Sequence, residues 1–304
     1  MKTLTSSSLA KFRTCPKRYW FGYELGRVPA RESDALAFGT LWHTCMEHWW
    51  TGGMKAVVAY LTEHAGGIDP VDAAKIAALL ADYNPPAERY EVISIEKEFT
   101  MPIRNPNTGR AMRNYQLAGK IDLMLRRITD GHLWICDHKT TAREIIGFGT
   151  YWQALQMDSQ MGNYCLATDA AGFVYDAVRK PGIRLCKTDE KQAVALDVRP
   201  SEAYQLRCQV GIKASTDEYY QWREFQRMEH DTREAAMDLW QHAKMLHECV
   251  KADRWPRNCN SCVGMYGMCP YLQVCVGNAT IDDDDLFRDK ASAHEELSAQ
   301  DAKQ

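Results

Sequence analysis

The segment Leu117–Thr141, LAGKIDLMLRRITDGHLWICDHKTT, restricts the possible folds of this 304-residue chain more than any other segment. It holds two apolar runs separated by Thr129-Asp130-Gly131, a sequence typical of a turn, and therefore predicts a hairpin of two strands. Each strand carries one carboxylate, Asp122 on the first and Asp137 on the second. Pairing of the strands would bring these two carboxylates close together.

A lysine follows the second carboxylate at a spacing of two. Because successive side chains of a strand point to opposite faces, Asp137 and Lys139 share a face. Two buried carboxylates beside one lysine are costly unless their charges are balanced. A divalent cation such as Mg²⁺ or Mn²⁺ would balance them, since both ions prefer carboxylate oxygens. The alternative is a surface hairpin with an Asp137–Lys139 salt bridge, which an isolated D-x-K tripeptide would favour.

Two short motifs in this hairpin resemble a known signature. Gly119-x-x-Asp122 followed by Asp137-His138-Lys139 resembles the PD-(D/E)XK nucleases. The flanking sequence resembles their RecB-like exonuclease branch, which includes CRISPR-associated and phage-encoded iron–sulfur exonucleases. The resemblance implies an α/β fold with a restriction-endonuclease-like core, a mixed sheet flanked by helices. It also implies that Asp122, Asp137 and Lys139 are catalytic, and that the metal is held by both aspartates and the backbone carbonyl of His138.

A histidine precedes the hairpin on a separate element. Residues 35–50 predict an amphipathic helix in which His43 follows Gly39 by four positions. A lone histidine on a helix is usually a core or surface residue. The family's G-x-x-x-H helix carries a metal-binding histidine at this position, so the resemblance implies that His43 is a further ligand. A histidine ligand favours Mn²⁺.

The segment after the hairpin predicts a helix over 149–169 and a strand over 172–180. Gln160 and Tyr164 lie four apart and so share one face of that helix. They resemble the family's Q-x-x-x-Y pair, which implies contact with the DNA backbone. A helix between two strands also predicts a parallel strand pair inside a mixed sheet.

Other segments carry weaker signals. Residues 90–100 predict a strand, and Glu96 and Glu98 are expected on a solvated face, although they could be additional acids of the site. Residues 228–250 predict a long helix. Residues 183–227 show no clear pattern.

The N-terminal segment alternates basic and aromatic residues. This combination suits single-stranded nucleic acid, because cations follow phosphates and rings stack on bases. We therefore expect Lys17 and Arg18 to contact DNA. The alternative is an aromatic core with a solvated basic rim, and it is favoured for the rings themselves. The residues concerned are Lys11, Phe12, Arg13, Lys17, Arg18, Tyr19, Trp20 and Phe21.

Eleven cysteines are many for a reducing compartment, where disulfides are disfavoured. Zinc held by Cys259, Cys262, Cys269 and Cys275 is one alternative, since C-x2-C is a zinc spacing. A [4Fe–4S] cluster held by Cys15, Cys262, Cys269 and Cys275 is the other. The resemblance implies the cluster, because RecB-like exonucleases often carry one N-terminal cysteine and three C-terminal ones that end in C-P-x4-C. Cys259 is then surplus.

Such a cluster would join the two ends of one domain and stabilise it as a crosslink does. We expect a single nuclease domain over 1–277, with its core at about 35–180. The cluster-binding segments would be 5–30 and 255–277. Residues 278–304 are expected to form an acidic polar tail or a loose helix.

Composition excludes some classes of function. The net charge is −3, so no global basic field attracts nucleic acid; this counts only mildly against DNA binding, because basic charge can be local. No apolar run reaches the length of a membrane span, and the N-terminus lacks the apolar core of a signal peptide, so we expect a cytoplasmic protein without a membrane partner.

The expected function is a metal-dependent DNA exonuclease. It would act on single strands or duplex ends in recombination, repair, phage DNA processing or CRISPR adaptation. The alternative is a DNA-end-binding subunit of a larger recombination or adaptation complex, with little activity alone. A zinc-stabilised scaffold without catalysis is a third alternative.

Overall fold

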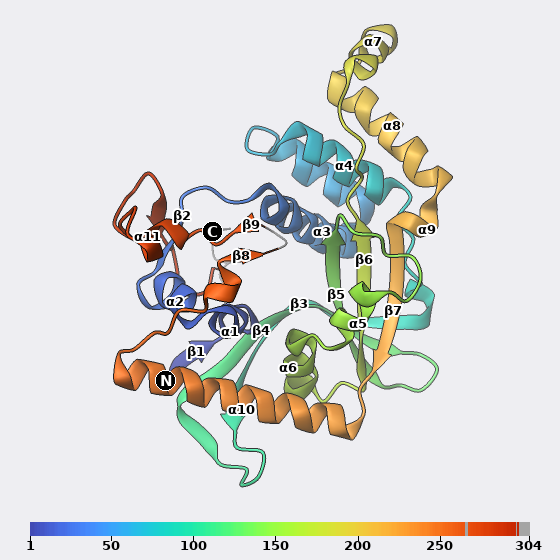
Figure 1. Cartoon of the computed structure of the whole chain (residues 1–304). Coiled ribbons are helices and arrows are strands. Elements are labelled where there is room, and N and C mark those ends of the chain that lie inside the picture. Colours follow the sequence, from blue (N-terminus) through green and yellow to red (C-terminus); the bar gives the residue numbers. More distant parts are fainter. Residues whose placement is uncertain (265–266, 296, 298–304) are drawn as a thin grey trace.

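The structure, a computed structural model, describes residues 1–264, 267–295 and 297, and a mixed β-sheet forms its centre (Figure 1). The strands run in the order β1-β4-β5-β6-β7, and β3 pairs with β4 along its other edge. The pairs β3–β4, β4–β5 and β6–β7 are antiparallel, whereas β1–β4 and β5–β6 are parallel. The strands are β1 (Lys2–Leu4), β3 (Tyr90–Arg104), β4 (Ala111–Arg127), β5 (Leu133–Thr141), β6 (Gly172–Arg179) and β7 (Tyr220–Gln226).

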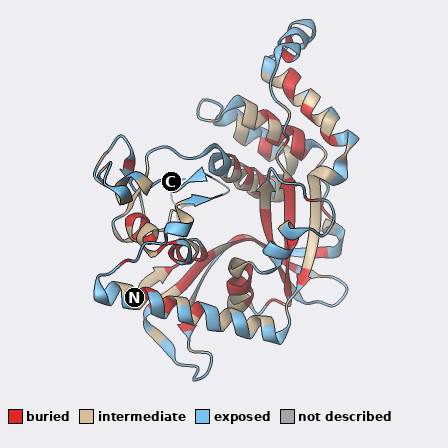
Figure 2. Cartoon of the chain, in the orientation of Figure 1, coloured by how far each residue is buried: buried red, intermediate tan, exposed pale blue. Residues whose placement is uncertain are grey.

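The predicted hairpin and parallel pair are both present. Apolar residues on both faces of β5 and β6 explain why these strands are central and buried (Figure 2). The connection from β5 to β6 contains two helices, α5 (Thr150–Gln156) and α6 (Ser159–Thr168), where one was predicted. The break occurs because Asp158 accepts a hydrogen bond from the backbone N–H of Gln160 and so begins a new helix.

Helices cover both faces of the sheet. Ile135 of β5 packs with residues of α6 in one apolar cluster, whereas Trp134 and Cys136 belong to another cluster, on which Trp50 of α3 packs. Helix α3 (Asp34–Glu63) bends at Gly52-Gly53, where Gly53 has a φ of 67°. Helices α4 (Pro70–Ala81) and α10 (Glu229–Ala252) complete the layers.

The N-terminal helices and the C-terminal segment 255–276 pack against each other. Helices α1 (Ser6–Thr14) and α2 (Pro16–Tyr19) are followed by a π-helical turn (Trp20–Glu24). The C-terminal segment packs on them, because Trp255 stacks on Tyr19 at 5.7 Å and the N–H of Lys17 donates to the Pro256 carbonyl at 3.1 Å. That segment continues through a 3₁₀ turn (Cys259–Ser261), β8 (Val263–Gly264), β9 (Gly267–Met268) and α11 (Leu272–Val276).

The predicted acidic tail contains regular structure. Strand β10 (Phe287–Asp289) pairs with β2 (Arg27–Pro29), and Phe287 is buried. Arg27 pairs with Asp284 at 2.7 Å and with Asp289 at 3.1 Å, so part of the acidic charge serves to hold this segment. The expectation of a tail or loose helix is therefore wrong for this part. Residues 296 and 298–304 of the predicted tail lie outside the described residues.

Residues 183–227, which showed no clear pattern, form an arm and the edge strand β7. Helix α8 (Pro200–Ala214) packs on α4, and α7 (Lys187–Leu196) lies at the far end of the arm (Figure 1). The short helix α9 (Thr216–Tyr219) leads back into β7. Among the described helices, none combines the length and apolar character needed to cross a membrane.

Candidate functional site

The long strand β4 has a gap on one of its edges. On that edge β1 pairs with residues 115–117 and β5 pairs with residues 123–126, so residues 118–122 pair with neither strand. Gly119 lies in this gap. A Cβ there would lie 2.7 Å from a ring carbon of Phe99 and from one of Tyr164, so only glycine lets the Tyr164 ring approach the strand.

Asp122 is the last residue of the gap and connects three elements. Its Oδ2 accepts a 2.8 Å hydrogen bond from the backbone N–H of His138 on β5. The same oxygen lies 3.3 Å from Nδ1 of His43 on α3. The structure thus brings the G-x-x-x-H and G-x-x-D motifs together, although 78 residues lie between His43 and Asp122 in the sequence.

Asp137 lies across the gap and is 3% exposed. Its Oδ2 lies 2.7 Å from Nζ of Lys139, and its Oδ1 accepts a 3.0 Å hydrogen bond from Nε2 of Gln160. The same Nε2 lies 3.4 Å from the Tyr164 hydroxyl. The Q-x-x-x-Y pair therefore faces the carboxylates, and Gln160 contacts one of them directly.

Glu96 is a third carboxylate at this place, and the expectation that it is solvated is wrong. Its side chain is buried and pairs with Lys120, and its φ of 51° is left-handed within a strand. The flanking pairs Ile95–Leu123 and Lys97–Ile121 place it opposite Asp122. The left-handed backbone redirects the side chain, which no alternation pattern could reveal. Glu98 is exposed, as expected.

Two further polar residues, Tyr83 and Asp176, lie behind the site on the other face of the sheet, where they contact His138 directly or through each other. Nδ1 of His138 lies 2.7 Å from Oδ2 of Asp176, and the Tyr83 hydroxyl donates to the same oxygen at 2.6 Å. All three side chains are buried. Sequence reasoning missed Asp176 and Tyr83. A buried acid within the apolar strand GFVYDAVR was the available signal for Asp176.

The charges of the site are coupled. Burial works against the charge of His43, but Asp122 outweighs it and raises the pKa of His43 to about 9. Burial would raise the pKa of Asp122, yet His43 and His138 hold it well below its usual value. Burial raises the pKa of Asp137, an effect that Lys139 opposes and Asp122 reinforces. At neutral pH the site therefore holds a His43–Asp122 ion pair.

The donor atoms suit a divalent cation, because two carboxylates and an imidazole are ligands that Mn²⁺ accepts and carboxylates suit Mg²⁺. In the part of the chain that the structure describes, however, no three His, Cys, Asp or Glu side chains are placed to hold one metal ion. Each aspartate instead has a cationic partner, His43 for Asp122 and Lys139 for Asp137. A cation at this site would have to displace Lys139 from Asp137 and take the place of the proton on His43.

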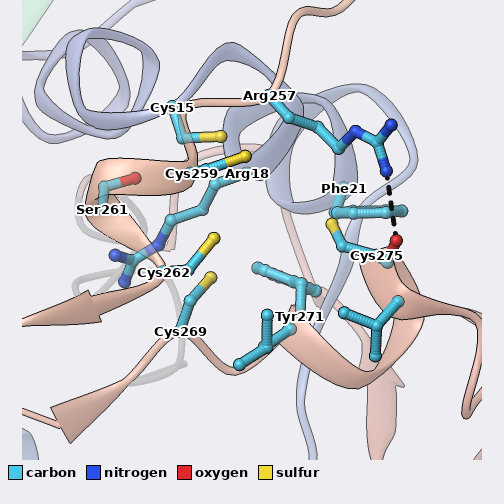
Figure 3. Close-up of a pocket in the computed structure, with 12 residues that line it drawn as sticks. Cys15, Arg18, Phe21, Arg257, Cys259, Ser261, Cys262, Cys269, Tyr271 and Cys275 are labelled. Atoms are coloured by element: carbon cyan, nitrogen blue, oxygen red, sulfur yellow. Dashed lines mark hydrogen bonds between the residues drawn. The ribbon is translucent and has the colours of Figure 1, made fainter.

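Five cysteines line a cavity of about 250 Å³ where the two chain ends meet (Figure 3). Their sulfur atoms face the same space. Cys15 comes from the junction of α1 and α2, and the other four come from the C-terminal segment. Arg18 also lines this cavity, whereas Lys17 lines a neighbouring one. The cysteines are Cys15, Cys259, Cys262, Cys269 and Cys275.

A mixed sheet that gathers two aspartates and a lysine where two strands part is the architecture of a nuclease. The family model of the PD-(D/E)XK nuclease superfamily matches residues 3–276, and the chain belongs to that superfamily. The predicted family and α/β fold are thereby confirmed. None of the curated proteins matches the chain.

Two solved structures are similar to the chain. One is described as "Putative exonuclease" from Eubacterium rectale. It is 13% identical, with a TM-score of 0.50, and the match covers 98% of this chain and 93% of that chain. The other is described as SSO0001. It is 12% identical, with a TM-score of 0.38, and the match covers 85% of this chain and 80% of that chain. At these identities the likeness concerns the fold alone.

Proposed function

We propose that the chain is a metal-dependent DNA exonuclease that uses Mg²⁺ or Mn²⁺. The observation that carries the proposal is the meeting of His43, Asp122, Asp137 and Lys139 at the gap between β1 and β5 on the edge of β4. A scaffold has no use for these four residues in one place. Such an activity would serve recombination, repair, phage DNA processing or CRISPR adaptation.

Each residue of the site would have a distinct role. His43, Asp122, Asp137 and the His138 carbonyl would hold the cation, which lowers the pKa of bound water and neutralises phosphate charge. Lys139 would move away from Asp137. It would then orient the attacking water and offset negative charge in the transition state. Gln160 holds Asp137 in place and, with Tyr164, would lie against the DNA backbone.

We also propose that the cysteine cavity holds a [4Fe–4S] cluster. The geometry favours it over zinc, because Zn–S bonds of about 2.3 Å require four thiolates to converge on one point. No three of the described cysteines converge in this way, yet five face one cavity. A cluster separates its ligands more widely, since each thiolate binds a different iron. Cys15, Cys262, Cys269 and Cys275 would be the ligands.

Anaerobically purified protein with end-labelled single-stranded and duplex oligonucleotides and Mn²⁺ tests the enzyme proposal. We expect products that shorten progressively from one end and no cutting of circular DNA. Asp122→Asn should abolish this cleavage, because it removes a carboxylate ligand of the proposed metal ion. The matched control is Glu218→Gln, which removes a half-exposed carboxylate paired with Arg179 at 3.1 Å, far along the chain from the site. Cleavage at the wild-type rate by Asp122→Asn would refute the assignment.

A DNA-end-binding subunit of a larger complex is the second candidate. The arm favours it, because apolar side chains are exposed along it, including Val194 at 85% and Val210 at 71%. The same assay separates the candidates. DNA binding without turnover by the purified chain, with Mn²⁺ present, would support the subunit.

A further inference from the structure

A second cavity lies next to the cysteine cavity and is lined by three cations. Its volume is about 420 Å³, and Lys17, Arg254 and Arg257 all face it. Lys17 comes from α2 and the two arginines from the C-terminal segment, so the cavity exists only because the chain ends meet. It shares no residue with the site at the edge of β4.

The cations lack acidic partners. Within the described residues, no carboxylate lies within 4.0 Å of a side-chain nitrogen of these three residues, whereas thirteen other lysines and arginines form ion pairs at that distance. Like charges held together in this way repel one another, and a bound anion would relieve the repulsion.

Contacts within the chain hold two of the three cations, Lys17 and Arg257, in place. The N–H of Lys17 donates to the Pro256 carbonyl at 3.1 Å, and Arg257 donates to the Cys275 carbonyl at 3.2 Å. Nζ of Lys17 lies 3.5 Å from the centre of the Trp20 ring, which fixes its direction. Lys17 and Arg257 are therefore positioned before any ligand arrives, which reduces the entropy lost on binding.

The aromatic residues beside the cavity are engaged elsewhere. Phe21 stacks on Tyr271 at 4.9 Å and Trp255 stacks on Tyr19 at 5.7 Å, and both Phe21 and Trp255 are buried. These rings therefore belong to the core, which is the alternative favoured for the rings from the sequence. They offer no free face on which a base could stack. The cavity presents charge without a stacking surface, which suits a phosphate better than a nucleobase.

We propose that this cavity binds a phosphate group, with Lys17 and Arg254 as its principal contacts. In naming DNA as the source of the phosphate, the inference rests on the proposed nuclease function. A phosphate bound here would hold the strand independently of base sequence. The phosphate could belong to the backbone or to a strand end, and the experiment separates the two.

The test measures binding of 3′-labelled single-stranded oligonucleotides by fluorescence anisotropy in EDTA, with full-length protein purified anaerobically. Lys17→Gln and Arg254→Gln should each weaken binding of every sequence roughly fivefold, and should reduce the slope of log Kd against log salt by about 0.7. Lys213→Gln on α8 is the control, because Lys213 is exposed and lies on the arm. Iron content and melting temperature should match the wild type.

Oligonucleotides with a 5′-phosphate and a 5′-hydroxyl identify the source. A loss confined to phosphorylated ends assigns a terminal phosphate, whereas an equal loss assigns the backbone, and either result supports the site. An unchanged affinity and salt slope in both variants would overturn it. Because no divalent metal is present, this result is independent of cleavage. A chain that binds here but never cuts would refute only the nuclease proposal.

Discussion

The backbone N–H of His138 donates a 2.8 Å hydrogen bond to Oδ2 of Asp122, at the point where the ladder between β4 and β5 ends. The last pair of that ladder is Leu123–Cys136, so Asp122 and Asp137 are the first residues beyond it. The carboxylate of Asp122 thus takes the place of a backbone partner. Any change that moves residue 138 will also move Asp122.

The residues behind His138 should therefore control metal binding without touching the metal. Tyr83→Phe removes the 2.6 Å hydrogen bond to Asp176 and loosens the ring of His138. We expect an affinity for Mn²⁺ that is roughly tenfold weaker, within the range for outer partners of metal sites. Titration calorimetry measures it.

Tyr220→Phe is the matched control for this change. The Tyr220 hydroxyl donates to the Leu79 carbonyl at 2.6 Å, and its ring lies 6.2 Å from that of Tyr83. Both variants should lose about 1 kcal/mol of unfolding free energy. If both bind Mn²⁺ equally well, Tyr83 is only structural.

Lys139→Gln should keep affinity for DNA and metal but lose most of its turnover, because in the proposed mechanism Lys139 acts on the transition state. Single-turnover cleavage and DNA binding, measured in parallel, give the comparison. Lys180→Gln is a suitable control, since Lys180 is similarly exposed (24% against 26%) and pairs with Asp72 at 3.0 Å. Parallel losses of affinity and rate would instead make Lys139 a phosphate contact.

Metal affinity should rise with pH. With a pKa of about 9, His43 is protonated at neutral pH, and a cation that it binds must displace this proton. Between pH 6.5 and 8.5 the Mn²⁺ affinity should increase about tenfold per pH unit, with release of one proton per ion. The His43→Gln variant should bind Mn²⁺ more weakly, and its Mn²⁺ affinity should no longer rise with pH. If the affinity of this variant still rises with pH, His43 is excluded as the group that releases the proton.

The same group predicts the pH dependence of the metal-free fold. The folded pKa of His43 lies above its ordinary value of 6.5, so the His43–Asp122 pair stabilises the fold fully below pH 6.5. This contribution declines as the pH rises through about 9. In EDTA, the melting temperature of the wild type should fall over that interval more than that of His43→Gln.

Cys15→Ser should remove iron and the brown colour, whereas Cys259→Ser should leave both nearly unchanged. Cys15 is a ligand only in the cluster proposal, and Cys259 only in the zinc alternative. Cys186→Ser controls for loss of an exposed thiol remote from the cavity. If metal analysis found zinc without iron, and if Cys15→Ser did not change the zinc content, the cluster proposal would be refuted and the zinc alternative supported. Loss of ligation should also increase cleavage by protease, because ligation and folding are coupled.

The sequence predicted those parts of the site that depend on local periodicity. Strand alternation placed Asp137 and Lys139 on one face, and helical spacing placed Gln160 near Tyr164. Glu96 was mispredicted because its direction depends on a left-handed backbone within β3. Asp176 was missed because its two partners, Tyr83 and His138, come from segments that are distant in the sequence, which only the tertiary fold brings together.

The arm of α7 and α8 enters and leaves the sheet at one point. Val178 of β6 pairs with Tyr220 of β7 in the sheet, and Arg179 forms an ion pair with Glu218 just beyond. These contacts hold the base of the arm together whatever the length of the arm. The inner part, where Tyr204 and Ile212 pack on α4, belongs to the core, but α7 does not. The tip can therefore lengthen, shrink or be exchanged during evolution while Asp122, Asp137 and Lys139 keep their places.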